Sequence, residues 1–235
     1  MQHKKNIRRS SFFKFKKIYS SDYYNVSFYR GWHELSIFRI EFLKNINRKN
    51  LLNKYIVRND YGIEKALIIS KGSSIIKKNK YFTKKLKKFD CLHTNKSFKN
   101  LEIQCKKGSQ LFIIVGKRKI SNNKKTIFFN FEKDLKKINL WGGQCISRVF
   151  HGHKFTLVLF RLKKGFQFHD KGHKNEQITW LIKGKMKFYV KHKNTTLAAN
   201  KKSVDIGPFD FHGGRSFGAI GFDAFSPKRS EKRYS

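Results

Sequence analysis

One stretch of the sequence carries most of the residues whose types and spacing could do chemistry. Residues 165–184 read GFQFHDKGHKNEQITWLIKG and place His169, His173 and Gln177 at intervals of four, and His212 follows in a later segment. Side chains alternate along a strand, so residues an even number apart share a face if the strand bends little. Imidazoles with an oxygen donor suit Fe, Mn, Co, Ni or Zn. The pattern therefore predicts a divalent metal site on these four residues.

Further residues near this pattern are candidates for the rest of an active site. Lys171 or Glu176 is predicted to move a proton while the metal polarises a carbonyl or enolate oxygen. Arg215, shortly after His212, has the planar guanidinium that pairs with a substrate carboxylate, with a plain surface charge as the alternative. Trp180 is a candidate substrate contact, with a place in the core lining as the alternative.

The elements that must position these residues are predicted to be strands. Strands separated by turn signals at short intervals indicate an all-β sandwich or barrel. The best candidate for a helix is short and covers residues 45–52. The expected strands are apolar, rich in Ile, Val and Phe, and separated by Lys, Asn and Gly turns; they cover residues 35–42, 66–69, 111–115, 126–131, 155–162, 178–182 and 186–190.

The two halves of the chain resemble each other, which predicts an internal duplication. Residues 63–72 (IEKALIISKG) align with residues 175–184 (NEQITWLIKG), so that Glu64 matches Glu176. The expected domains are a basic segment over residues 1–24 that is disordered or targeting, a first barrel over 25–125 and a second barrel over 126–235.

The segment 165–184 also resembles the first motif of the cupin superfamily, G-x5-H-x-H-x3-E-x6-G. His173 falls on the second motif histidine, and Gln177 falls on the glutamate. Lys171 stands where the family has its first histidine, and a protonated lysine is repelled by a dication. Residues 205–213 (DIGPFDFHG) resemble the second cupin motif, with His212 as its histidine.

This resemblance implies an all-β fold of two tandem antiparallel jelly-roll barrels, a bicupin whose first barrel is degenerate. In that first barrel the matching positions are Asn59, Tyr61 and Lys65, so a metal is expected only in the second. The resemblance also implies a metal-dependent enzyme of the isomerase or dioxygenase type that acts on a small anionic organic molecule in small-molecule or specialised metabolism. The alternative is a metal-free, non-catalytic bicupin that binds a small ligand or a protein and whose histidines are polar lining.

The charge balance raises a third class of function. The chain has 54 Lys and Arg against 15 Asp and Glu, a net charge of +39, which is typical of proteins that bind nucleic acid or another polyanion. The basic residues run through the whole chain, however, and the abundance of Lys, Asn, Ile and Phe is what A/T-rich coding produces. A basic nucleic-acid-binding protein is therefore kept as a further alternative.

Cysteine usage and hydropathy bear on the compartment. Cys91, Cys105 and Cys145 have no C-x-x-C spacing, which suits a reducing environment rather than a disulfide framework. No apolar run approaches the roughly 20 residues that a membrane helix needs, so no membrane association is expected. We expect a cytoplasmic protein, with organellar targeting by the basic N-terminus and assembly as a homodimer as open alternatives.

Overall fold

The computed structural model describes residues 10–31, 35–49, 63–79, 82–98, 101–119 and 126–230. The regular secondary structure of these described residues consists of β-strands, so the fold class is all-β, as the sequence predicted. None of the described residues forms a helix long and apolar enough to cross a membrane.

The strands follow one another in short steps through the first half of the chain and become long in the second half. The first half contains β1 (Ser11–Phe13), β2 (Lys16–Ser20), β3 (Tyr24–Arg30), β4 (Leu35–Phe42), β5 (Ile46–Lys49), β6 (Ile63–Lys71), β7 (Ser74–Asn79), β8 (Phe82–Leu86), β9 (Asp90–Thr94), β10 (Glu102–Cys105), β11 (Gln110–Lys119) and β12 (Thr126–Asn130). The second half contains β13 (Ile138–Leu140), β14 (Cys145–His151), β15 (Thr156–Asp170), β16 (Glu176–Val190), β17 (Lys193–Ala198), β18 (Ser203–Ile206) and β19 (His212–Ser226).

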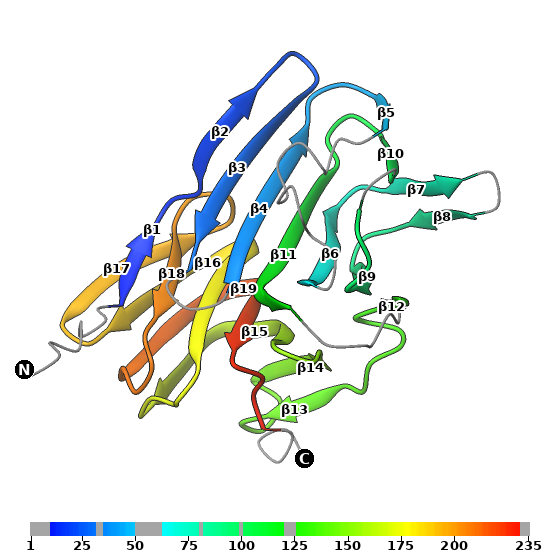
Figure 1. Ribbon diagram of the computed structural model, residues 1–235. Coiled ribbons are helices and arrows are strands. Elements are labelled where there is room, and N and C mark those ends of the chain that lie inside the picture. The colour runs from blue at the N-terminus through cyan, green and yellow to red at the C-terminus, as the bar shows by residue number, and fades with distance from the viewer. Residues whose placement is uncertain are drawn as a thin grey trace, which may run out of the picture.

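These strands form two antiparallel barrels, which lie side by side in Figure 1. The first barrel combines a seven-stranded sheet, β12-β9-β6-β11-β4-β3-β2, with a four-stranded sheet, β5-β10-β7-β8. The second barrel is a single eight-stranded sheet in the order β1-β18-β16-β19-β15-β14-β13, with β17 paired to β16.

The second barrel closes because its three longest strands turn a corner together. Gly165 in β15, Gly184 in β16 and Gly218 in β19 all have positive φ, at 85°, 77° and 88°. A Cβ on Gly184 would overlap the carbonyl oxygen of Gly218, so a side chain there would push the strands apart. Each strand therefore has one half in the sheet that packs on the first barrel and one half on the far side of the second.

Between the barrels lies an apolar core to which both contribute. The first barrel supplies buried side chains from β4, β6 and β11, and the second supplies them from β15, β16 and β19. Alternation along β16 directs Ile178 and Trp180 into this shared core and Leu181 into the interior of the second barrel. Burying a large apolar side chain contributes about 1.5 to 3 kcal/mol, so this shared core holds the two barrels together.

A buried carboxylate adds a polar link between the barrels. Glu64, fully buried at the start of β6, accepts hydrogen bonds from the backbone N–H groups of His153 and Lys154, both at 2.7 Å, in the turn between β14 and β15. It also pairs with His93 Nε2 at 2.6 Å. The first barrel thus caps a turn of the second.

The duplication predicts the same link in the opposite direction. Glu176, the counterpart of Glu64, is also fully buried, and its Oε1 lies 2.8 Å from where a Cβ on Gly31 would stand. Gly31 follows β3 and Gly152 follows β14, and both donate their N–H to a carbonyl a few residues later. Glu176 of the second barrel therefore meets a turn of the first, as Glu64 meets a turn of the second.

Two local expectations differ from the structure. The segment 45–52, predicted as a short helix, contains strand β5, because Ile46–Lys49 pair with Glu102–Cys105 of β10. The segment 1–24, predicted as disordered or targeting, contains β1 and β2 in its described part, while residues 1–9 lie outside the described residues. Cross-strand pairing available only in the folded barrel overrides these local preferences.

Strand pairing also crosses the expected domain limits. β1 pairs with β18 of the second barrel, as Figure 1 shows, while β2 pairs with β3 of the first. β12 pairs with β9 of the first barrel, so the chain passes from one barrel to the other between β12 and β13.

The link through Glu64 yields a prediction about stability. Glu64→Ala removes the fully buried carboxylate that accepts from two backbone N–H groups and pairs with His93, and we expect it to lower the free energy of unfolding by about 3 to 5 kcal/mol. Urea denaturation of the purified protein measures the difference. Glu102→Ala, which removes a half-buried carboxylate from β10, is the control and should cost about 0.5 kcal/mol or less. A loss below about 1 kcal/mol for Glu64→Ala would show that this link contributes little.

Candidate metal centre

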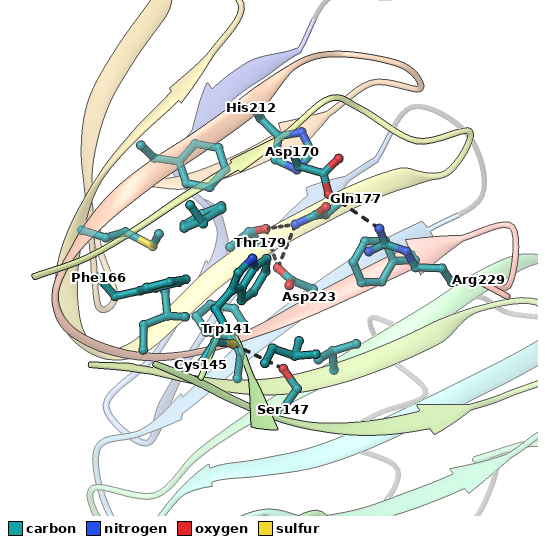
Figure 2. A pocket seen from close by; sticks show the side chains of 18 residues that line it. Trp141, Cys145, Ser147, Phe166, Asp170, Gln177, Thr179, His212, Asp223 and Arg229 are labelled. Atoms are coloured by element: carbon teal, nitrogen blue, oxygen red, sulfur yellow. Dashed lines mark hydrogen bonds and ion pairs between the residues drawn. The ribbon is translucent and has the colours of Figure 1, made fainter. Parts of the chain in front are cut away.

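A cavity of about 110 Å³ lies inside the second barrel, between the two halves of its bent strands (Figure 2). Its wall consists of residues from the interior faces of β15, β16 and β19, from β13, β14 and the turn between them, and from the segment after β19. They are Leu140, Trp141, Cys145, Ser147, Val158, Phe160, Leu162, Phe166, Phe168, Asp170, Gln177, Thr179, Met186, Phe188, His212, Asp223, Phe225 and Arg229.

The strand register sorts this lining into two ends. His212 pairs with Asp170, and Asp223 pairs with Thr179, all far along the strands from the glycine corner. We call this region the polar end; it comprises Asp170, Gln177, Thr179, His212, Asp223 and Arg229. Toward the corner the lining is hydrophobic, and we call that region the apolar end; it comprises Phe160, Leu162, Phe166, Phe168, Met186 and Phe188.

Three groups that bind metals converge at the polar end. Ligand atoms of Asp170, His173 and His212 all lie within 4.8 Å of one another. His212 Nδ1 donates to the carbonyl of Asp210 at 2.8 Å, which orients the imidazole ring. Asp170 Oδ1 accepts from the backbone N–H of Gly172 at 2.9 Å, which fixes the carboxylate. Among the described residues no other such cluster of three is found.

The state of His173 fits a metal ligand. Its Nε2 lies 2.9 Å from Gln177 Oε1, and its Nδ1 is buried without a hydrogen-bond partner. Burial lowers the pKa of His173 to about 4, and the positive charge of Arg229 acts in the same direction. The imidazole is therefore neutral at neutral pH and has a lone pair to donate. Two histidines and one carboxylate form the donor set that divalent iron and related metals use with coordination positions left open.

Gln177, predicted as a ligand, instead orients His173. Its Oε1 accepts from His173 Nε2, and its Nε2 donates to Thr179 Oγ1 at 3.0 Å and to Asp223 Oδ1 at 3.1 Å. The amide is thereby fixed between a donor and two acceptors. This chain from Asp223 through Gln177 keeps Nδ1 as the atom of His173 that has a free lone pair.

A second carboxyl group lies in the cavity wall. Asp223 accepts from the hydroxyl of Thr179 at 2.5 Å as well as from Gln177. Burial raises the pKa of Asp223 to about 6, although both hydrogen bonds and the charge of Arg229 act to lower it. A carboxyl with such a pKa can exchange a proton near neutral pH.

A buried guanidinium completes the polar end. The side chain of Arg229 is 7% exposed, and its Nη2 lies 3.8 Å from Asp170 Oδ2. Its Cζ stands 4.3 Å from the centre of the Phe225 ring, and its backbone N–H donates to Thr156 Oγ1 at 2.9 Å. Figure 2 shows Arg229 on one side of the cavity and Phe166 on the other.

The structure brings His173, Gln177 and His212 together, whereas His169 and Lys171 lie outside the site. His169 is exposed and hydrogen-bonds Tyr189 on the outer face of the sheet, because the inward positions of β15 are Phe166, Phe168 and Asp170. Lys171 is exposed in the loop after β15. The strand ends at Asp170, so alternation does not extend to Lys171, and the carboxylate takes the place expected for the first motif residue.

The other predicted site residues also face away from the cavity. Trp180 is 1% exposed in the shared core and stacks on Phe222. Glu176 lies on the same face of β16, toward the first barrel, and is neither at the cavity nor placed to move a proton there. Arg215 is exposed, opposite Gln167 and Lys187 on the outer face. In each case the period of two along the strand points the side chain away from the barrel interior.

Sequence reasoning missed Thr179 and three charged residues of the site, Asp170, Asp223 and Arg229. Asp170 was detectable in principle, since a turn at Gly172, whose φ is 96°, breaks the alternation between Asp170 and His173. Asp223 and Arg229 stand more than 40 residues after Gln177 and carry no local signal. Only the pairing of β19 with β16 brings Asp223 beside Thr179.

The corresponding position in the first barrel is filled. Lys65, the counterpart of Gln177, is fully buried and donates from Nζ to the carbonyl of Ile63 at 2.9 Å. The same ammonium lies 5.4 Å from the ring centre of Phe98. A cation at this position opposes a divalent metal, and Asn59 and Tyr61, the other predicted counterparts, lie outside the described residues.

Comparison with known proteins shows which solved structures share this architecture. No protein-family model matches the sequence, and no curated protein matches it. Solved structures do match. Protein Ylba from E. coli has a TM-score of 0.70 at 10% identity, covering 94% of this chain and 92% of that chain. AerE from Microcystis aeruginosa has a TM-score of 0.69 at 10% identity, with 93% and 99% covered.

A third neighbour is an enzyme with a metal. The Bacillus subtilis oxalate decarboxylase, described by its Mn(II) centres, has a TM-score of 0.67 at 8% identity, covering 93% of this chain and 78% of that chain. These neighbours are cupin-type proteins, and oxalate decarboxylase is a bicupin. The chain therefore has the cupin fold, with two tandem antiparallel jelly-roll barrels, as the sequence motifs predicted.

The pKa of Asp223 leads to a pH prediction for the metal-free protein. The folded-state pKa of about 6 lies above the value of about 3.9 of an unfolded chain, so the native protein loses stability as the pH rises between these values. Asp223→Asn lacks this penalty. We expect its stability relative to the native protein to increase from about pH 4 to about pH 6 and then stay constant. Urea denaturation in the presence of a chelator measures it.

His173 provides the control of opposite sign. Its folded-state pKa of about 4 lies below the value of about 6.5 of an unfolded chain, so it makes the native protein more stable as the pH rises through this range. His173→Gln should therefore lose stability relative to the native protein over the same interval. Curves for both variants that run parallel to the native curve would contradict the assigned pKa shifts.

Proposed function

We propose that this protein is a metal-dependent enzyme of the isomerase or dioxygenase type that acts on a small anionic organic molecule. The observation that carries the proposal is the convergence of Asp170, His173 and His212 within 4.8 Å, with Asp170 and His212 in the wall of a cavity. A divalent metal bound there polarises a carbonyl or enolate oxygen of the substrate. Manganese in one structural neighbour supports a metal of this kind without identifying it.

The residues around the metal ligands have complementary tasks in this proposal. Arg229 attracts an anionic group to the polar end, which Arg215 cannot do from the outer face. Asp223 holds or accepts the proton that moves, a task that Lys171 and Glu176 cannot perform because they do not line the cavity. Gln177 keeps His173 oriented toward the cation.

The second candidate is a metal-free bicupin that binds a small ligand without chemistry. The observation that favours it is the position of Arg229, whose Nη2 lies 3.8 Å from Asp170 Oδ2. A guanidinium so near the carboxylate neutralises the negative charge that a metal requires. In this case the histidines line the cavity and the same anion binds to Arg229 alone.

Metal binding separates the two candidates. We expect the purified protein to take up about one equivalent of Mn(II) or Fe(II) per chain, as measured by elemental analysis after dialysis. His173→Ala and His212→Ala each remove one of three ligands and should weaken binding by at least about tenfold. His169→Ala is the matched control, since it removes a histidine from the same segment that faces outward, and should leave metal uptake unchanged. Stoichiometric metal in both His173→Ala and His212→Ala would exclude this site, and no uptake by the native protein would favour the metal-free candidate.

A further inference from the structure

The cavity has a chemical gradient that constrains what it binds. Along β15 the inward residues run Phe166, Phe168, Asp170, and on the paired strands Phe188 and Gly214 share the level of Phe168. His212 pairs with Asp170 at the next inward level. The apolar end and the polar end are therefore neighbouring levels of one barrel rather than two separate pockets.

The apolar end has no charged group that could attract a polar ligand. Phe166, Met186 and Phe188 are each 9% exposed or less, and they belong to the apolar core of the second barrel. Cys145 also lines this end, and burial raises the pKa of its thiol to about 11, so it stays neutral. A ligand that fills this end must present hydrocarbon to it.

An aromatic side chain closes the apolar end. Trp141 lines the cavity in the turn between β13 and β14, with its ring 5.3 Å from that of Phe166. It is 55% exposed and has a φ of 49°, and Gly142 and Gly143, also with positive φ, follow it. Figure 2 shows the Trp141 ring between Phe166 and Arg229. The turn thus places an indole as the wall that limits the length of a ligand.

The polar end selects the charged group. The guanidinium of Arg229 is a planar fork that matches a carboxylate. Asp170 and Asp223 line the same end and oppose any anionic group there; Arg229 supplies the attraction for one carboxylate, and a second carboxylate would meet the two aspartates without a cation of its own. A single carboxylate is therefore the group that this end fits.

We propose that the cavity binds a small aliphatic monocarboxylate, with the carboxylate at Arg229 and a short branched hydrocarbon body at the apolar end. The volume of about 110 Å³ spans both ends of the cavity, so it has to hold the carboxylate as well as the hydrocarbon body and favours a short ligand. This inference rests on the proposed function, since it names the substrate class of the same site, and it sets Trp141 as the residue that determines the length.

A series of carboxylates of increasing chain length, called the ladder below, tests the substrate class. The probes are acetate, 2-methylpropanoate, 3-methylbutanoate, hexanoate and octanoate, with oxalate as a polar dianion, each titrated calorimetrically into the full-length protein with and without Mn(II). We expect affinity to rise by about fourfold per buried carbon up to 3-methylbutanoate and to fall for octanoate. Oxalate should bind more weakly than 3-methylbutanoate. A flat ladder, or oxalate as the tightest ligand, would overturn the inference.

Two variants test the roles of the residues at the two ends of the cavity. Trp141→Ala opens the apolar end, so octanoate should gain at least about tenfold in affinity while 3-methylbutanoate changes little. Arg229→Gln removes the guanidinium and should weaken every carboxylate by at least about tenfold. The matched controls are Phe217→Ala and Arg215→Gln, both exposed on the outer face, and neither should alter the ladder. Because Trp141 is exposed on a turn, its variant tests the inference even if Arg229→Gln fails to fold.

The outcomes distinguish this inference from the proposed function. If the protein shows the expected order of carboxylate affinities but takes up no metal, the result supports the ligand class and contradicts the proposed metal-dependent enzyme. Metal uptake that depends on His173 and His212 with a flat ladder supports the metal site and contradicts the ligand class. An unchanged preference for short carboxylates in Trp141→Ala would contradict the role of Trp141 as the wall.

Discussion

The face-to-face packing of the two barrels is the constraint on which the rest of the structure depends. Each barrel gives one face of its sheet to a shared apolar core, and each places a buried glutamate against a turn of the other. Glu64, itself fully buried, accepts from two backbone N–H groups of a turn in the second barrel. This arrangement settles which face of β15, β16 and β19 is left to line the cavity, because the other face is already occupied.

The two barrels show how one framework supports or excludes a site. At matching positions the second barrel has Gln177, which orients a histidine, and the first has Lys65, which fills the interior with its own ammonium. The backbone around both positions is similar, with a glutamate just before and an apolar strand after. The buried ammonium of Lys65 is therefore one difference that separates the first barrel from the barrel with the candidate metal centre.

The positive net charge of the chain is not concentrated at the candidate site. The chain carries +39, yet the carboxylates of Glu64, Glu176, Asp205 and Asp210 are buried, and Asp170 and Asp223 line the cavity. Many of the lysines are exposed, and those of the bent strands lie at the corner and on the outer face. The acidic residues are thus used inside the molecule, and Arg229 is the cation that lines the cavity wall.

The sequence by itself determined the fold class, the duplication and the segment that carries the site, because strand alternation, turn residues and motif spacing are local properties. It predicted a site on His173, Gln177 and His212, three residues that lie close together in the structure. Only the tertiary structure decided that Asp170 replaces His169 and Lys171, since β15 points Phe166, Phe168 and Asp170 inward and the turn at Gly172 breaks the alternation before His173. Asp223 and Arg229 reach the cavity through the closing strand and the segment after it, so their contribution depends on pairing between residues far apart in the chain, which no local pattern contains.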